Sequence, residues 1–82
     1  MDASEQSMFD EIVALLEPFN ADNIPLTPDT DISADLKIDS VSVMDFVMEV
    51  EDKFDIDIPL NVLSDTRTIS DLMGVVKERT NA

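Results

Sequence analysis

The chain has 82 residues and a mass of 9.1 kDa, which is enough for one small domain. Its 19 acidic and 5 basic side chains give a formal net charge of −14. This charge excludes nucleic acids and anionic membrane surfaces as partners, because both carry negative phosphates. The chain has no Cys, His, Trp or Tyr. Without Cys, His and Tyr it lacks most of the usual nucleophilic and acid–base side chains, and it cannot form a Cys-based zinc site, so we expect it not to be an enzyme.

The N-terminal residues 1–5 are acidic, whereas a secretory signal peptide begins with basic residues followed by an apolar run. The apolar runs of the chain are only a few residues long, far short of the roughly 20 needed to span a bilayer. We therefore expect a cytoplasmic protein without stable membrane insertion.

A first helix is predicted over residues 4–18, where apolar side chains recur at helical spacing. Asp2 or Ser4 is its candidate N-cap, and Pro18 is expected to end it. Residues 19–38 follow as a long loop, because its prolines exclude a regular helix. Its apolar side chains are expected to anchor the loop across the helices; they are Ile24, Leu26, Ile32, Leu36 and Ile38.

A second helix is predicted over residues 39–54, with an apolar stripe at spacings of three and four. Pro59 then suits the first turn of a short helix over residues 60–64. The last helix is predicted over residues 69–79, with Thr68 as its cap and Gly74 costing it about 1 kcal/mol relative to Ala. The chain is thus predicted to be a single all-α domain of three main helices, one short helix and a long first loop.

Alternating acidic and polar residues in the loop suggest a calcium site, since Asp29, Asp31, Ser33 and Asp35 stand at alternate positions as in an EF-hand. The pattern fails at the position of the turn glycine, which is Ala34, and at that of the bidentate Glu, which is Ser40. We therefore expect no specific metal site, only weak and diffuse binding of divalent cations.

The second helix carries a distinctive exposed face. Residues 31–57 contain nine acidic residues and two lysines, and so hold half of the net charge of −14. Apolar and acidic side chains mix on the face of the helix away from the core, which is either a solvated face or a docking surface for basic partners. We call these residues the docking surface: Val41, Met44, Asp45, Met48, Glu49 and Asp52.

Ser40, at the start of this helix, has three interpretations. It could cap the helix, as Ser often does. It could be a catalytic nucleophile, but no His is present to activate it. It could instead be modified by another enzyme, since a phosphate ester there would lie at a helix N-terminus, which favours anions.

The tripeptide Asp39-Ser40-Val41 resembles the Asp-Ser-Leu motif of acyl carrier proteins. The resemblance extends over nearly the whole chain. It includes Leu36 and three longer segments, which are residues 27–30, 47–59 and 68–72.

The resemblance implies a four-helix bundle with one minor helix. It also implies that Ser40 receives 4′-phosphopantetheine from coenzyme A through a phosphopantetheinyl transferase, with Asp39 orienting the metal and the phosphate. The thiol of this group carries an acyl chain as a thioester. The implied partners are this transferase and the enzymes that load, modify and transfer acyl chains in fatty acid or specialised lipid biosynthesis. These enzymes are expected to bind the carrier through basic surface patches. We expect the carrier to be a monomer.

Three positions depart from the family pattern. Val41 replaces the usual Leu, Lys37 replaces the usual Gly, and Glu49 replaces a usual small residue. These departures favour a specialised carrier over a housekeeping one, and the lack of a Gly-Gly turn before Ser40 argues against a peptidyl carrier. Two alternatives stay open: an aminoacyl or D-alanyl carrier, and an unmodified acidic adaptor.

An acyl carrier also needs space for its cargo. We expect a pocket between the second helix and the last two helices, because flexible aliphatic side chains repack at modest cost. Its predicted lining is Phe46, Val47, Ile58, Leu63, Ile69, Leu72 and Val76.

Overall fold

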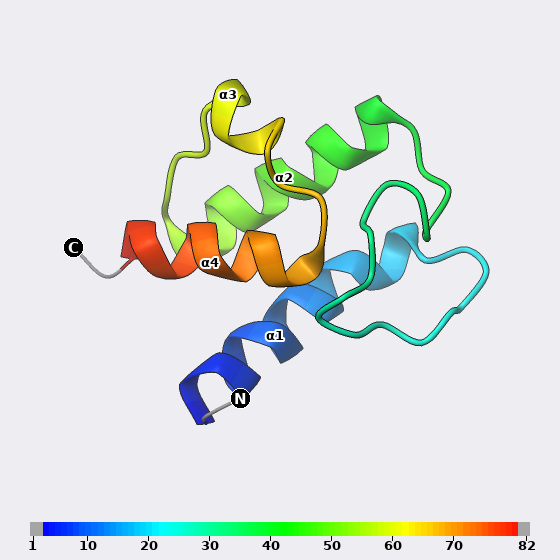
Figure 1. Cartoon of the computed structure of the whole chain (residues 1–82), viewed down its shortest axis with the longest axis horizontal. Helices are drawn as coiled ribbons and strands as arrows, with labels where there is room; N and C mark the ends of the chain where they lie inside the picture. The colour runs from blue at the N-terminus through cyan, green and yellow to red at the C-terminus, as the bar shows by residue number, and fades with distance from the viewer. Residues whose placement is uncertain (1–2, 81–82) are drawn as a thin grey trace.

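The computed structural model describes residues 3–80. Over this range the chain forms the helices α1 (Ala3–Leu16), α2 (Ser40–Phe54), α3 (Leu60–Leu63) and α4 (Ile69–Thr80), a 3₁₀ turn η1 (Glu17–Phe19), and no β-strand (Figure 1). The prediction of three main helices and one short helix is confirmed. None of the helices in the described range has the length and apolar character needed to cross a bilayer.

The ends of α1 differ from the prediction. The helix begins at Ala3, so Ser4 lies inside it and does not cap it, while Asp2 lies outside the described residues. It ends at Leu16, not at residue 18, and the chain continues as η1. Pro18 has no N–H to donate to the helical ladder, so the chain tightens into a 3₁₀ turn, where the Asn20 N–H bonds to the Glu17 carbonyl at 3.1 Å.

Side-chain caps define the starts of the two longer C-terminal helices. Asp39 is the N-cap of α2, and its carboxylate accepts the Ser42 N–H at 2.9 Å. The predicted cap of α4 is present: the Thr68 hydroxyl accepts the Asp71 N–H at 3.1 Å, while the Asp71 carboxylate accepts the Thr68 N–H at 3.2 Å. This reciprocal pair satisfies N–H groups that the helix itself leaves unbonded.

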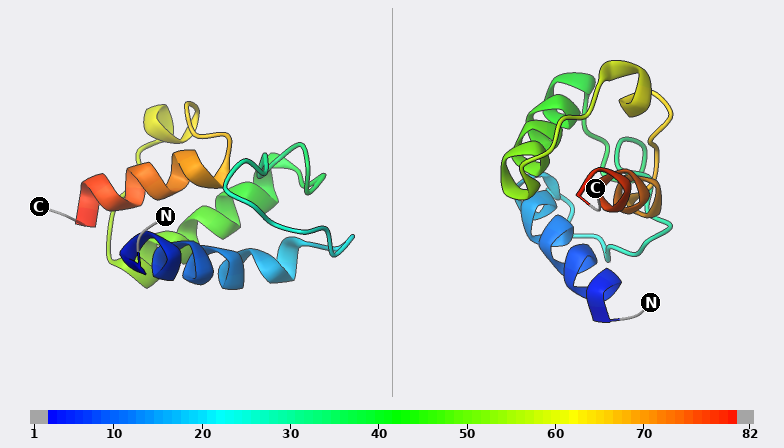
Figure 2. Two further views of the ribbon diagram at one scale, coloured as in Figure 1. Left: turned by 60° about the horizontal axis from the view of Figure 1, so that its bottom comes forward. Right: turned by 90° about the vertical axis from the view of Figure 1, so that its left-hand side faces the viewer.

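The core forms where α1 packs against both α2 and α4 (Figure 2). Phe46 of α2 is fully buried, and its ring meets that of Phe19 edge to face with centroids 6.1 Å apart. Such aromatic pairs are worth about 0.5–1.5 kcal/mol beyond the area they bury. The other buried apolar residues are Ile12, Leu16, Ile32, Leu36, Val47, Val50, Ile58, Ile69, Leu72, Met73 and Val76.

The long loop between η1 and α2 is fastened to the start of α4. The Ile32 N–H bonds to the Arg67 carbonyl at 2.9 Å, and the Ile69 N–H bonds to the Thr30 carbonyl at 3.1 Å, around an isolated antiparallel bridge of Asp31 with Thr68. The predicted anchors take part, since Ile32 and Leu36 are buried and the other three, Ile24, Leu26 and Ile38, pack against the core. The loop thereby holds the start of α2 in place.

A tight left-handed turn ends this loop just before α2. The Ile38 N–H bonds to the Ser33 carbonyl at 3.2 Å, and Lys37 between them has a φ of 54°. This is the Schellman arrangement that usually closes on glycine, because a β-carbon is strained at positive φ. Lys37 therefore occupies a backbone position at which glycine would carry less strain.

Candidate functional site

Ser40 lies at the exposed tip of α2. It is the first helical residue, directly after the cap Asp39, and its side chain faces solvent. The interpretation of Ser40 as the N-cap is wrong, because Asp39 is the N-cap and its carboxylate accepts the Ser42 N–H. The Ser40 hydroxyl is therefore not required for capping.

Asp39 and Ser42 are hydrogen-bonded to each other next to Ser40. The backbone N–H of Ser42 and then its hydroxyl hold the pKa of the Asp39 carboxyl below its ordinary value. Hydrogen bonds to the charged form of a carboxyl favour ionisation, so Asp39 carries a full negative charge near neutral pH. Ser42 is half-buried and engaged with this carboxylate, which leaves Ser40 as the accessible hydroxyl at the start of the helix.

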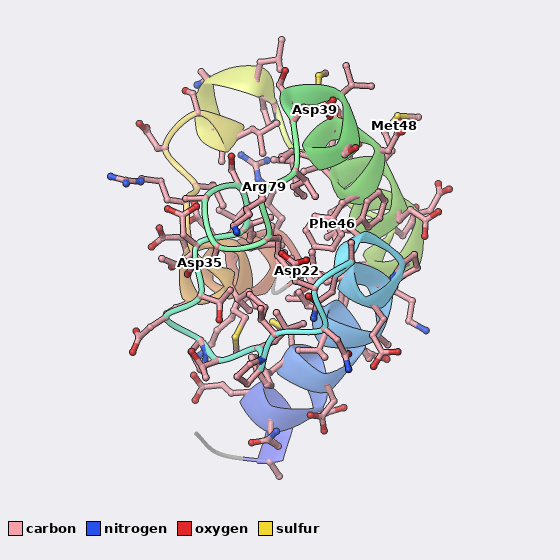
Figure 3. The ribbon with its side chains drawn as sticks, turned by 90° about the vertical axis from the view of Figure 1, so that its right-hand side faces the viewer. Asp22, Asp35, Asp39, Phe46, Met48 and Arg79 are labelled. Atoms are coloured by element: carbon pink, nitrogen blue, oxygen red, sulfur yellow. The ribbon has the colours of Figure 1, made fainter. Side chains whose placement is uncertain are left out.

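An open hollow of about 310 Å³ begins at Ser40. It lies between the first turns of α2 and the neighbouring α3, which stand side by side at the top of Figure 3. Its lining is mostly apolar, with serines at the edges: Ser33, Ser40, Val43, Met44, Leu60, Leu63 and Ser64.

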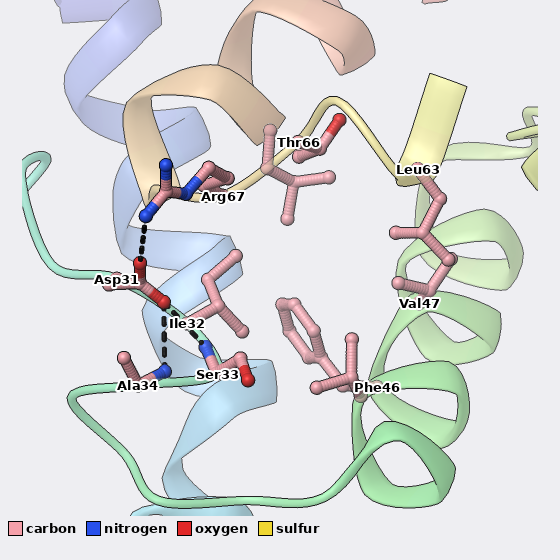
Figure 4. A pocket seen from close by; sticks show the side chains of 11 residues that line it. Asp31, Ile32, Ser33, Ala34, Phe46, Val47, Leu63, Thr66 and Arg67 are labelled. Atoms are coloured by element: carbon pink, nitrogen blue, oxygen red, sulfur yellow. Dashed lines mark hydrogen bonds and ion pairs between the residues drawn. The ribbon is translucent and has the colours of Figure 1, made fainter. Parts of the chain in front are cut away.

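A second cavity, of about 280 Å³, lies between the loop, α2 and the segment that joins α3 to α4 (Figure 4). Three residues, Ser33, Val43 and Leu63, line both spaces. The complete lining of the inner cavity is Asp31, Ile32, Ser33, Ala34, Val43, Phe46, Val47, Leu63, Thr66, Arg67 and Leu72. The two spaces thus adjoin, with Ser40 in the lining of one and the buried Phe46 in the lining of the other.

The predicted pocket lining divides into two groups. Phe46, Val47, Leu63 and Leu72 do line the inner cavity. The remaining three, Ile58, Ile69 and Val76, are buried in the core and do not line it.

The sequence prediction also missed the loop side of this cavity, which includes Ile32 and Thr66. These residues lie on segments with no helical period, and only the hydrogen-bonded loop places them against α2. The apolar character of the loop was the one signal that could have indicated them.

One end of the inner cavity is polar. A guanidinium nitrogen of Arg67 lies 3.7 Å from the Asp31 carboxylate, which also accepts the N–H groups of Ser33 at 3.1 Å and Ala34 at 2.8 Å (Figure 4). Asp35 is likewise engaged, since it accepts the Asp31 N–H at 2.8 Å. These carboxylates stabilise the loop, and within residues 3–80 no group of three or more potential ligands could hold a metal ion.

The docking surface on α2 is exposed. Val41 and Met48 are 67% and 62% exposed, and Figure 3 shows Met48 pointing outward while Phe46 points inward. The surface also contains Met44 and the exposed acids Asp45, Glu49 and Asp52. In the described part of the chain, none of these three carboxylates has an ion-pair partner. The sequence prediction did not include Leu60 of α3, which is also exposed and apolar. Three of the four residues of α3 are apolar, and so short a helix cannot bury all three side chains, which was the one signal in the sequence.

Comparison with known proteins identifies the family. Residues 10–76 match the model of the phosphopantetheine attachment site. The acyl carrier protein of Picosynechococcus sp. is 31% identical over 78 residues, which cover 94% of this chain and 96% of that protein. The acyl carrier protein of Rickettsia typhi is 36% identical over 95% of this chain and 87% of its own length, and a probable acyl carrier protein of Caulobacter vibrioides is 38% identical over 72% and 70%.

The chain therefore belongs to the phosphopantetheine-binding acyl carrier protein family. It is a non-catalytic carrier, and its prosthetic group is 4′-phosphopantetheine. The residues at the tip of α2 suit this group: Ser40 offers an exposed hydroxyl, and an apolar hollow of about 310 Å³ adjoins it. When attached, the group supplies the thiol that this cysteine-free chain lacks.

Proposed function

We propose that this protein carries acyl chains as thioesters on a 4′-phosphopantetheine group attached to Ser40, and that it delivers them between enzymes of fatty acid or specialised lipid biosynthesis. The observation that supports this most directly is the position of Ser40. It is an exposed hydroxyl in the lining of a mostly apolar hollow, and this hollow adjoins a second cavity that reaches Phe46.

The attachment reaction balances with coenzyme A as the donor. A bond forms between the Ser40 oxygen and the phosphorus next to the pantetheine, and the bond between the two phosphates of the coenzyme breaks. Adenosine 3′,5′-bisphosphate leaves, and the hydroxyl proton passes to the transferase. The neighbouring Asp39 is ionised and exposed, so it can help the transferase to orient the metal and the phosphate.

We propose the inner cavity as the storage site for the acyl chain. Val43, Phe46 and Leu63 give it an apolar wall, and each CH₂ group that enters gains about 0.8 kcal/mol. The expected result is a melting temperature of the loaded carrier that rises with acyl length until the cavity is filled. A melting temperature that does not change with chain length would place the chain outside the protein.

The identity of the attachment site is tested by intact mass. The wild type and the variants Ser40→Ala and Ser42→Ala are incubated with coenzyme A and a broad-specificity phosphopantetheinyl transferase. The wild type and Ser42→Ala are expected to gain the mass of one phosphopantetheine, and Ser40→Ala is expected to gain none. Modification of the Ser40→Ala variant would overturn the assignment, and an unmodified wild type would favour the acidic adaptor.

An aminoacyl or D-alanyl carrier would use the same attachment site. The cavity distinguishes it from an acyl carrier, because the apolar wall of Val43, Phe46 and Leu63 stabilises a long alkyl chain, whereas burial of the charged amine of an amino acid against that wall is costly. A comparison of melting temperatures between carriers loaded with an amino acid and with a medium-chain acyl group is therefore informative. Stabilisation by the acyl group alone is expected.

A further inference from the structure

The polar end of the inner cavity holds a hydrogen-bond acceptor and a donor that do not bond to each other. The Asp31 carboxylate uses one oxygen, Oδ1, to accept the N–H groups of Ser33 and Ala34 at 3.1 and 2.8 Å. Its other oxygen, Oδ2, accepts no hydrogen bond within residues 3–80 and lies 3.7 Å from a guanidinium nitrogen of Arg67. This distance is longer than a hydrogen bond, so both groups keep the capacity to bond to a third group.

The spacing of these two groups suits a hydroxyl. A hydroxyl is both a donor and an acceptor, and its hydrogen bonds are about 2.7–3.0 Å long. One oxygen atom can lie within that distance of two atoms that are 3.7 Å apart. A hydroxyl placed between them would donate to Asp31 Oδ2 and accept from the Arg67 guanidinium.

The opposite wall of the cavity is apolar. Figure 4 shows Phe46 and Val47 across the cavity from Asp31 and Arg67. An alkyl chain that fills the space gains from this wall, but it displaces water from the two polar groups and returns no hydrogen bond to them. Because such burial of polar groups is costly, the cavity suits a chain that is mostly alkyl and carries one polar group.

The charges at the site favour a hydroxyl over a carboxylate as that polar group. The Asp31 carboxylate lies beside Arg67, and the chain has a net charge of −14, so an anionic cargo is repelled here. A hydroxyl is neutral and avoids this repulsion. It also donates a hydrogen bond to Oδ2, which an ionised carboxylate cannot do.

We propose that this protein carries a hydroxyacyl chain, whose hydroxyl lies away from the thioester and bridges the side chains of Asp31 and Arg67. The inference rests on the proposed attachment at Ser40 and on storage of the acyl chain in the inner cavity. Asp31 and Arg67 line the inner cavity and not the hollow at Ser40, whereas Ser40 lines the hollow and not the inner cavity. The carbons next to the attached arm therefore lie nearest the hollow, and the hydroxyl is on a carbon farther along the chain.

The test measures the melting temperature of the full-length protein loaded on its prosthetic group with matched acyl chains. Alkyl chains of six, eight and ten carbons are compared with chains of the same lengths that end in a hydroxyl. At the length that reaches the polar end, the hydroxyl is expected to raise the melting temperature by about 4–8 °C over the alkyl chain. This is the shift expected for one net hydrogen bond in a domain this small.

Two variants and one control locate the effect. Arg67→Met removes the donor and keeps an unbranched side chain, and Asp31→Asn keeps an oxygen for the loop N–H groups but turns the Oδ2 acceptor into a donor. The control Lys77→Met also removes one exposed cation, but Lys77 does not line the cavity. The gain from the hydroxyl is expected to vanish in Arg67→Met, to fall in Asp31→Asn and to persist in Lys77→Met. Each gain is measured within one variant, so changes in the stability of the fold itself cancel.

Three results would overturn the proposal. The first is a hydroxyl that raises the melting temperature at none of the three lengths. The second is a gain that persists in Arg67→Met or that is also lost in Lys77→Met. The third is a larger gain from chains that end in a carboxylate, which would make the cargo anionic. A melting temperature that ignores alkyl length would instead refute storage in the cavity, and a wild type that gains no phosphopantetheine would refute the attachment, so these failures are distinguishable.

Discussion

Lys37 is expected to destabilise the fold through its backbone. Its φ of 54° lies in the left-handed region, where an L-residue with a β-carbon costs roughly 1–2 kcal/mol. Replacement by glycine removes this cost but adds roughly 0.5–1 kcal/mol of chain entropy in the unfolded state. With the midpoints of these two ranges, the variant Lys37→Gly is expected to gain about 0.75 kcal/mol in the free energy of unfolding from the backbone.

The side chain of Lys37 complicates a direct comparison with the wild type. Its ammonium lies 4.0 Å from the Asp22 carboxylate, but both side chains are mostly exposed, so the pair contributes at most about 1 kcal/mol. Lys37→Ala is the matched control, because it loses the same charge and the same ion pair and keeps a β-carbon at positive φ. The difference between the two variants isolates the backbone contribution.

The assay is thermal and urea unfolding of both variants, followed by far-ultraviolet circular dichroism in one buffer. A difference of 1 kcal/mol shifts the melting temperature of a domain this small by about 4–8 °C. Lys37→Gly is expected to melt about 3–6 °C above Lys37→Ala, with an unchanged urea m-value. If Lys37→Ala is as stable as Lys37→Gly, the reasoning from backbone strain is refuted.

Three further predictions concern stability. Gly74→Ala is expected to stabilise α4 by about 1 kcal/mol in urea unfolding, since the added β-carbon would meet nothing within 4 Å apart from its chain neighbours and the backbone of its own helix; a loss of stability would contradict this. Hydrogen bonds from the backbone N–H groups of Thr68 and then Arg67 lower the pKa of Asp71 in the folded protein. The ionised carboxylate therefore stabilises the fold at pH values above its pKa in the unfolded chain, which is about 3.9. This stabilisation is lost as the pH falls through the lower pKa of the folded protein. Wild type is thus expected to exceed Asp71→Asn in stability near neutral pH and to lose that advantage in acid, and a constant difference down to acid pH would contradict this. The melting temperature is expected to rise with NaCl, and more with millimolar Mg²⁺ or Ca²⁺, because a net charge of −14 repels itself; a saturable, micromolar response to Ca²⁺ would instead indicate a specific site.

The local sequence was sufficient to predict the helices. Helical spacing of apolar residues depends only on neighbours three and four positions apart, so the stripe on α2 and the break at Pro59 could be read directly. The cap of α4 was equally local, since Thr68 and Asp71 stand three residues apart. Ser40 was indicated by its place after Asp39 together with the resemblance of the whole chain.

The tertiary structure alone decided the spaces around Ser40. The inner cavity combines Ile32 of the loop, Phe46 of α2 and Leu72 of α4, which are distant in the sequence and meet only because backbone hydrogen bonds fasten the loop to the start of α4. The same long-range packing buries Ile58, Ile69 and Val76 away from the cavity that they were predicted to line.

The exposure of Leu60 and the backbone strain at Lys37 also depend on the folded chain. Leucine is most often buried, so the exposure of Leu60 beside Ser40 follows from how α3 docks, not from its residue type. Lysine carries no sequence signal for a left-handed turn, and the positive φ of Lys37 arises because the hydrogen bond from Ile38 to Ser33 closes the loop there. A residue's type and spacing determine which local structure it favours, whereas its exposure and its strain are set by contacts that only folding brings together.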